Sequence, residues 1–139
     1  MKVHHYLDVK AQEEVPGAVM RRVICEEQGA PNFCMRVFEV APGMKTPSHF
    51  HPWEHEVYVL SGQGKVVGED GAKKLSKDVA LFIAPNEKHF LQATGKAPLR
   101  FICVIPNVPR EMHSAATECR FVKSEEWQSC RQSTFARDR

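Results

Sequence analysis

The stretch GMKTPSHFHPWEHEVYVLSG, residues 43–62, decides the fold of this chain. It places His49 and His51 two positions apart, ahead of a run in which apolar and polar residues alternate. Side chains at i and i+2 of an extended segment point to the same face, so both imidazoles are directed to one side. His55 begins the alternating run and shares its face with the valines that follow. The stretch therefore predicts β-structure with three histidines on one buried face.

The rest of the first hundred residues also favours strands. Runs rich in β-branched and aromatic residues recur every 8 to 12 positions and are separated by turn residues such as SGQG and EDG, which is typical of a sandwich or barrel. The expected strands are residues 18–25, 33–40, 55–60, 64–68, 79–84, 88–93 and 98–105. The sequence therefore predicts an all-β domain.

The chain of 139 residues is the length of one domain. We expect a single domain over residues 1–106. The prolines that follow the last strand separate this domain from a tail, residues 107–139, in which a helix can start with Ser124 as its N-cap. The tail is thus predicted to be a short, partly helical appendage.

Charge and hydropathy exclude several classes of function. The net charge of +2 leaves no basic stripe for a nucleic acid, and no run approaches the roughly 20 apolar residues of a membrane helix. The first ten residues lack the apolar core of a signal peptide. The five cysteines are odd in number and contain no CxxC pair, so we expect buried thiols, with one disulfide or a reactive thiol as the alternative. A cytoplasmic protein is the expectation.

A fourth histidine can complete the cluster. His89 follows the turn-like residues 85–88 and precedes apolar residues, so it can point inward from a different hairpin. Three histidines within seven residues on one buried face would be costly without a purpose. Four neutral imidazoles suit one divalent first-row metal, with Mn or Fe favoured and Ni, Co, Cu or Zn as the other candidates. A tetrahedral zinc with four histidines would be closed and structural instead.

These residues resemble the cupin superfamily, over about residues 15 to 106. Gly43, His49, His51 and Gly62 match the first cupin motif, and the context of His55 is similar to the four-histidine subset. Spacing alone also allows Glu56 as the metal ligand in place of His55, but that register would turn the valines of the run outward. His55 is therefore preferred, with Glu56 as the alternative ligand.

The second cupin motif is matched less well. Pro85 and His89 are present, whereas Val79, Glu87 and Ala93 stand where the motif has glycine, glycine and asparagine. The resemblance implies a double-stranded β-helix, that is, a conical jelly-roll barrel of two antiparallel sheets with the metal near its wider mouth. It also implies a homodimer paired through the N-terminal strands.

Alternation along the strands nominates a substrate pocket. Arg36, Phe38, Phe101, Cys103 and Ile105 are expected to point inward, which makes the surroundings of the metal mostly apolar. Arg36 can hold a carboxylate or enolate by a charge-assisted hydrogen bond. No residue emerges as a general base, so the catalytic residues stay unassigned.

The site predicts a metal-dependent enzyme for a small organic substrate, such as an enol, a diketone or a carboxylate. Because no carboxylate ligand lowers the charge of the ion, oxidation of the dioxygenase type is the first hypothesis. The alternatives are a non-redox isomerase or lyase, and a binding or sensing module without catalysis.

Overall fold

The fold is seen in a computed structural model in which residues 1–107 are described. The rest of the predicted tail, with the helix expected after Ser124, lies outside the described residues. Within residues 1–107 the chain forms strands and two 3-10 turns and contains no α-helix. The elements are η1 (Tyr6–Asp8), β1 (Gln12–Val15), β2 (Ala18–Ile24), η2 (Glu26–Gln28), β3 (Phe33–Val40), β4 (His55–Ser61), β5 (Gln63–Gly68), β6 (Gly71–Ser76), β7 (Ala80–Ile83), β8 (Phe90–Ala93) and β9 (Leu99–Pro106).

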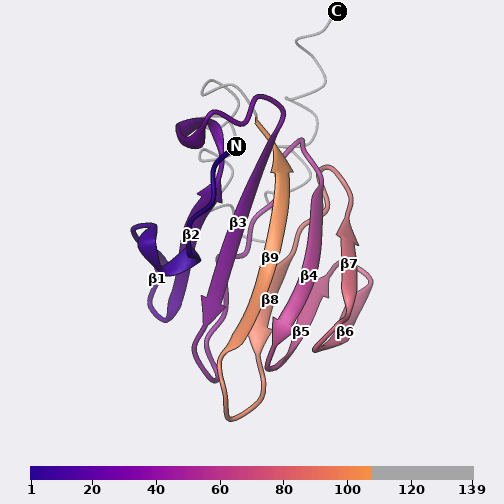
Figure 1. Ribbon diagram of the computed structural model, residues 1–139. Coiled ribbons are helices and arrows are strands. Elements are labelled where there is room, and N and C mark those ends of the chain that lie inside the picture. The colour runs from indigo at the N-terminus through magenta and orange to yellow at the C-terminus, as the bar shows by residue number, and fades with distance from the viewer. Residues whose placement is uncertain (108–139) are drawn as a thin grey trace, which may run out of the picture.

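The strands form two antiparallel sheets. One has six strands in the order β1-β2-β3-β9-β4-β7, and the other has three in the order β6-β5-β8. The six-stranded sheet faces the viewer in Figure 1, and the smaller sheet lies behind it. This arrangement confirms the expected all-β barrel of two antiparallel sheets.

Strand β9 shows how alternation builds the core. Its residues alternate between buried and half-buried. The buried ones are Leu99, Phe101, Cys103 and Ile105. Phe101 lies directly opposite Phe38 of β3, and their rings are stacked with centroids 5.0 Å apart. The inward side chains of neighbouring strands thus contact one another. The core that they form lies between the two sheets.

The turn between β4 and β5 requires a glycine. Gly62 has φ of +85°, a value that L side chains rarely adopt. A Cβ atom there would also lie 2.9 Å from the Cα of Leu99, so the backbone of the turn before β9 approaches too closely for any side chain.

All seven predicted strands are present, with ends shifted by at most two residues. The sequence did not predict β1 and β6. Both are short and rich in polar residues, and most of their residues are exposed or half-buried, so neither carries a clear alternation of apolar and polar residues.

The expectation of free thiols is wrong for two of the cysteines. Cys25 and Cys34 form a disulfide that joins the end of β2 to the start of β3, and both are buried. Cys103 is a buried free thiol. Only the pairing register of β2 with β3 decides that the first two meet, and the register contains an irregularity between Arg22 and Ile24 that the sequence does not reveal.

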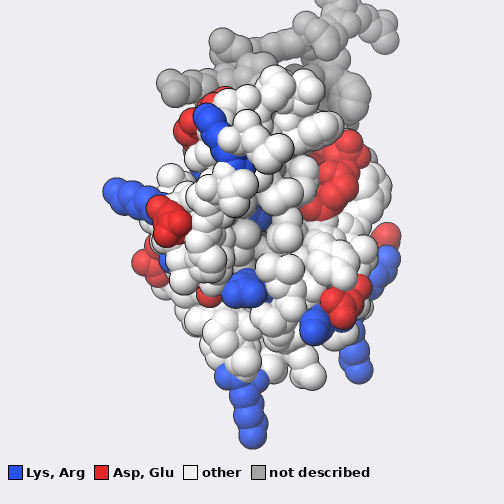
Figure 2. Space-filling model, in the orientation of Figure 1, with Lys and Arg blue, Asp and Glu red and all other residues white. Residues whose placement is uncertain are grey.

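The surface of the described part agrees with the balanced charge of the sequence. Figure 2 shows basic and acidic side chains scattered over the drawn face, without a continuous basic stripe. Within residues 1–107, no helix has the length and apolar character needed to cross a bilayer.

Candidate metal centre

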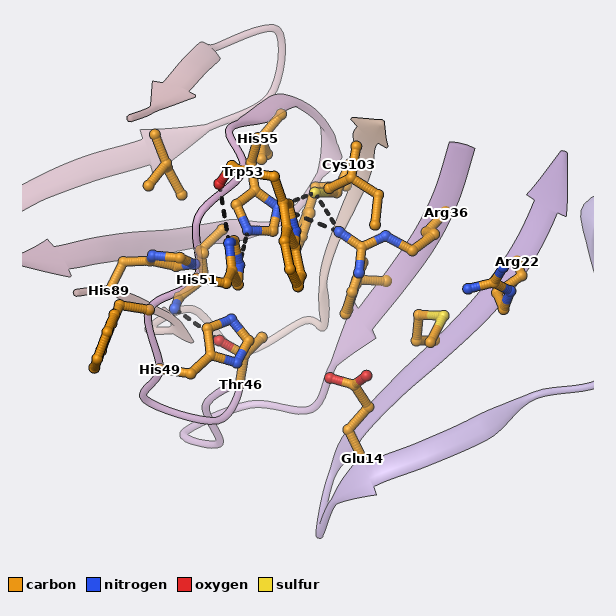
Figure 3. A pocket seen from close by; sticks show the side chains of 18 residues that line it. Glu14, Arg22, Arg36, Thr46, His49, His51, Trp53, His55, His89 and Cys103 are labelled. Carbon is orange, nitrogen blue, oxygen red and sulfur yellow. Dashed lines mark hydrogen bonds between the residues drawn. The ribbon is translucent and has the colours of Figure 1, made fainter. Parts of the chain in front are cut away.

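Four histidine side chains meet inside the barrel. Each of His49, His51, His55 and His89 offers one ring nitrogen, and these nitrogens all lie within 4.8 Å of one another (Figure 3). His51, His55 and His89 are buried, and His49 is half-buried. Since buried polar groups are costly, a cluster of this kind indicates a function for the four rings together.

Backbone pairing brings His49 beside His89. The two residues form an antiparallel bridge, with each amide N–H donating to the carbonyl of the other at 3.2 and 3.0 Å. The residues before His49 continue this pairing, because the N–H of Thr46 donates to the carbonyl of Leu91 at 2.9 Å. Residues 45–49 thus run along β8, which is why histidines 40 positions apart share one site.

The other two histidines follow His49 along the chain. His51 follows His49 by two residues in the extended segment, and His55 is the first residue of β4. The amide N–H of Asn86 donates to the carbonyl of His51 at 2.7 Å, which ties this segment to the turn before His89. The two Nε2 atoms of His51 and His55 lie 2.5 Å apart.

Hydrogen bonds fix the ring tautomers of two histidines. The Nδ1 atoms of His51 and His89 lie 2.9 and 2.7 Å from the backbone carbonyls of Trp53 and Glu87. A carbonyl only accepts, so each Nδ1 must carry the proton, and each Nε2 is left with a free lone pair. Outer hydrogen bonds of this kind orient the imidazole ligands of metal sites. The sequence could not assign these outer partners.

The environment keeps three of the four rings neutral, those of His51, His55 and His89. Burial, followed by the charges of His89 and Arg36, lowers the pKa of His51 to about 3. Burial also lowers the pKa values of His55 and His89, with Arg36 contributing to both shifts. Neutral imidazoles are the form that binds a metal.

The geometry fits one transition-metal ion. Metal–imidazole bonds are about 2.1 Å long, so two nitrogens on one ion lie within about 4.2 Å of each other. The observed spread of at most 4.8 Å needs only a small inward movement of the rings. With no carboxylate in the cluster, the ion would retain its full charge.

The histidines form one wall of a cavity of about 200 Å³. All five residues nominated for the substrate pocket line it, namely Arg36, Phe38, Phe101, Cys103 and Ile105. Apart from these five residues and the four histidines, most of the lining residues are apolar. Glu56 is exposed on the other face of β4, so the alternative ligand lies outside the cluster.

The guanidinium of Arg36 contacts the ring of His55. Its Nη2 is 3.0 Å from the Sγ of Cys103 and 3.2 Å from the Nδ1 of His55. Its Nε is buried without a hydrogen-bond partner, and no carboxylate within residues 1–107 lies within 4.0 Å of it. The guanidinium also lies over the ring of Phe38, 5.1 Å from its centroid. Arg36 therefore places a positive charge at the cavity wall that the described residues do not neutralise.

Several residues that line the cavity were not predicted from the sequence as pocket residues. Trp53 is buried, and its ring stacks on that of His51 with centroids 4.2 Å apart. Glu14 and Arg22 also line the cavity. Glu14 belongs to a strand that the sequence did not predict, and Arg22 is part of an Arg-Arg pair whose inward member only the register decides.

A comparison with protein families now gives the fold its name. Residues 36–105 match the family model described as a cupin domain. This chain belongs to the cupin family. The matched range contains all four histidines and all five nominated pocket residues, so the first resemblance drawn from residues 43–62 is confirmed.

Two polyketide proteins of Streptomyces are among the relatives of this cupin. The structure of the polyketide cyclase RemF from Streptomyces resistomycificus is 36% identical, with a TM-score of 0.70 over 76% of this chain and 79% of that one. The tetracenomycin polyketide synthase protein TcmJ of Streptomyces glaucescens is 31% identical over 84 residues. That match covers 59% of this cupin and 56% of TcmJ, so the chain spans little more than half of this relative.

A third relative carries no stated activity. The cupin 2 domain-containing protein from Halorhodospira halophila is 31% identical, with a TM-score of 0.62 over 81% of this chain and 88% of that one. The fold, the four-histidine cluster and the family together point to a metal ion, while the identity of that ion is left open.

Proposed function

We propose that this cupin is a metal-dependent enzyme that converts a small enolisable carbonyl compound, such as a β-diketone, without oxidising it. One observation carries the proposal: a cluster of four imidazoles lines a mostly apolar cavity that also holds the charge of Arg36, which no described residue neutralises. The likeness to the polyketide cyclase RemF supports this choice among cupin reactions, since RemF is 36% identical. Cyclase-type carbon–carbon bond formation is the favoured subclass.

His49, His51, His55 and His89 would hold one divalent transition-metal ion. When bound, such an ion supplies Lewis-acid chemistry toward a carbonyl or enolate oxygen. Mn or Fe stays the prediction for its identity, with Ni, Co, Cu and Zn as the other candidates. The cytoplasmic location and the homodimer also stay predictions.

The residues of the chain would select and orient the substrate. Arg36 places its charge at the cavity wall, where it favours an anionic oxygen over a neutral one. Phe38, Phe101 and Ile105 exclude water and favour an apolar carbon skeleton. Because a low-dielectric wall strengthens the attraction between Arg36 and an enolate oxygen, the cavity would favour the enolate over the ketone.

Oxidation of the dioxygenase type is the second candidate. It is favoured by the absence of any carboxylate from the described cluster, because a fully charged ion with open positions could take both an anionic substrate and dioxygen. The two candidates differ in whether oxygen is consumed, which makes them separable by experiment.

Ethyl 3-oxobutanoate is a suitable probe for the test. Protein loaded with Mn²⁺, Fe²⁺ or Zn²⁺ is incubated with the probe in D₂O, and loss of its methylene proton signal is followed by NMR beside an oxygen electrode. We expect the loaded protein to speed the exchange relative to loaded His51→Ala, with no oxygen uptake. Oxygen uptake that matches loss of the probe would favour the dioxygenase. Tight binding with neither exchange nor uptake would identify a binding module.

A further inference from the structure

Among residues 1–107, one carboxylate, that of Glu14, lines the cavity, and it lies at an irregular point of the sheet. Glu14 belongs to β1, and the register of β1 with β2 shifts between Glu13 and Val15. Glu13 pairs with Val19 and Val15 with Ala18, so Glu14 is the extra residue of a β-bulge. Bulges redirect a side chain, often next to an active site.

Because of the bulge, the side chains of two successive residues both point into the barrel. Val15 packs against the core, and Glu14 lines the cavity, whereas regular alternation would turn one of them outward. Figure 3 shows the Glu14 carboxylate pointing into the cavity from the strands opposite His89, with His49 and Arg36 near the same space. The acidic side chain therefore faces the volume that a substrate would fill.

Among the described residues, the Glu14 carboxylate has no partner that would explain its position. Within residues 1–107 its carboxylate makes no hydrogen bond and no ion pair within 4.0 Å. The nearby cation Arg22 is engaged elsewhere, because its Nε and Nη2 donate to the two carboxylate oxygens of Glu27 at 2.9 and 3.4 Å. Arg36 is occupied with Cys103 and His55. The carboxylate is thus free to act on a bound molecule.

Glu14 and Arg36 line the same cavity as the four histidines. A substrate that directs its carbonyl oxygen toward Arg36 and the imidazoles would present the carbon beside that carbonyl to the carboxylate of Glu14.

We propose that Glu14 is the catalytic proton-transfer residue of this cavity, a role that rests on the proposed enolate chemistry. A carboxylate oxygen of Glu14 bonds to a proton on the carbon beside the substrate carbonyl, and that C–H bond breaks. Its electron pair forms the enolate, whose negative charge rests on the carbonyl oxygen facing Arg36 and the histidines. Return of the proton to carbon restores the carboxylate, so nothing is oxidised or reduced.

The test compares Glu14→Gln with the wild-type protein in the exchange assay with ethyl 3-oxobutanoate. A positioned acid or base contributes about 10²- to 10⁴-fold to a rate, so we expect exchange at saturating probe to fall at least about 100-fold. Calorimetric affinity for the probe and the metal content should change less than about threefold, because neither the arginine nor the histidines are altered. Added acetate should restore part of the rate in Glu14→Ala by supplying the missing carboxylate.

Glu13→Gln is the matched control. Glu13 precedes Glu14 on the same strand and accepts a hydrogen bond from the N–H of Gly17 at 3.0 Å, which a glutamine oxygen can also accept. This variant should exchange the probe at the wild-type rate. If Glu14→Gln lost its near-UV circular dichroism, Glu14→Asp with acetate-rescued Glu14→Ala would decide the question instead.

The outcomes separate this inference from the function on which it rests. Wild-type exchange that persists in Glu14→Gln overturns the role of Glu14 and leaves the proposed function standing. Loss of probe binding with an unchanged rate at saturation also overturns it, because Glu14 would then bind rather than transfer protons. Exchange no faster in wild-type protein than in His51→Ala overturns the proposed function and the role of Glu14 together.

Discussion

His55 and Glu56 are neighbours in sequence but lie on opposite faces of β4. His55 is 6% exposed and belongs to the cluster, whereas Glu56 points to solvent. The pKa of Glu56 is raised, first by partial burial and then by the negative charge of Glu54, so two acidic groups lie together outside the barrel. Glu56 could reach the cluster only if β4 slipped by one residue, which would also expose Val57 and Val59.

Metal content should therefore depend on His55 and not on Glu56. Loss of an outer partner of a metal ligand typically costs about 10- to 100-fold in affinity, so loss of a ligand should cost more. We expect His55→Ala purified without added metal to lose most of its bound ion, and Glu56→Ala to keep it, as measured by elemental analysis. Far-UV circular dichroism checks that both variants are folded. The reverse pattern of metal loss would make Glu56 the ligand.

At the scale of elements, the turn after β4 lies close to the turn before β9. This close approach explains why residue 62 is a glycine. Gly62 and Gly71 both have positive φ angles, at +85° and +101°. Their surroundings differ, because a Cβ at Gly62 would lie 2.9 Å from backbone atoms of the turn before β9, whereas nothing lies within 4 Å of one at Gly71. A comparison of the two glycines thus separates the cost of a positive φ angle from the cost of steric overlap between an added Cβ and the backbone.

Gly62→Ala should destabilise the protein more than Gly71→Ala. The left-handed backbone alone costs an L residue about 1–2 kcal/mol, which applies to both positions. At Gly62 the overlap with backbone adds to this cost, because strands β4, β5 and β9 would have to move apart. Urea denaturation of the two variants beside the wild type measures the difference in the free energy of unfolding. Equal losses would mean that the turn yields without cost.

The same scale explains why the bulge in β1 was not predicted and why the disulfide was only the alternative to buried thiols. Both depend on which residues of β2 face those of its neighbours, and both lie where the register shifts. The polar residues around Glu14 carry no alternation that would indicate an inward side chain. The cysteines 25 and 34 are nine positions apart, a spacing that by itself predicts no bridge.

For the whole molecule, the buried histidines make stability depend on pH. Burial lowers the pKa of His51 from 6.5 to about 3, so between these values the unfolded chain binds a proton that the folded chain does not. The contribution of the neutral His51 ring to the free energy of unfolding is therefore fully present above pH 6.5. This contribution is lost as the pH drops toward 3. His55 and His89 shift in the same direction and add to the slope.

Metal-free protein should show this slope in chemical denaturation between about pH 7 and pH 4. In His51→Asn one of the titrating rings is gone, so the free energy of unfolding should fall less steeply over the same range. Bound metal should oppose the loss, because the ion stabilises only the folded state until protons displace it. Parallel pH profiles for wild-type and His51→Asn protein would contradict the assignment of the slope to this ring.

The sequence by itself determined the family, seven of the strands, the inward face of His49, His51 and His55, and the row of pocket residues around Arg36. These follow from alternation with period two, a local property that each strand carries in its own residues. Only the tertiary structure decided the rest: the pairing of His49 with His89, the stacking of Trp53 on His51, the disulfide and the inward turn of Glu14. Each of these depends on the register between segments that are distant in the chain or irregular in pairing, and register is set by packing of the whole barrel rather than by any single strand.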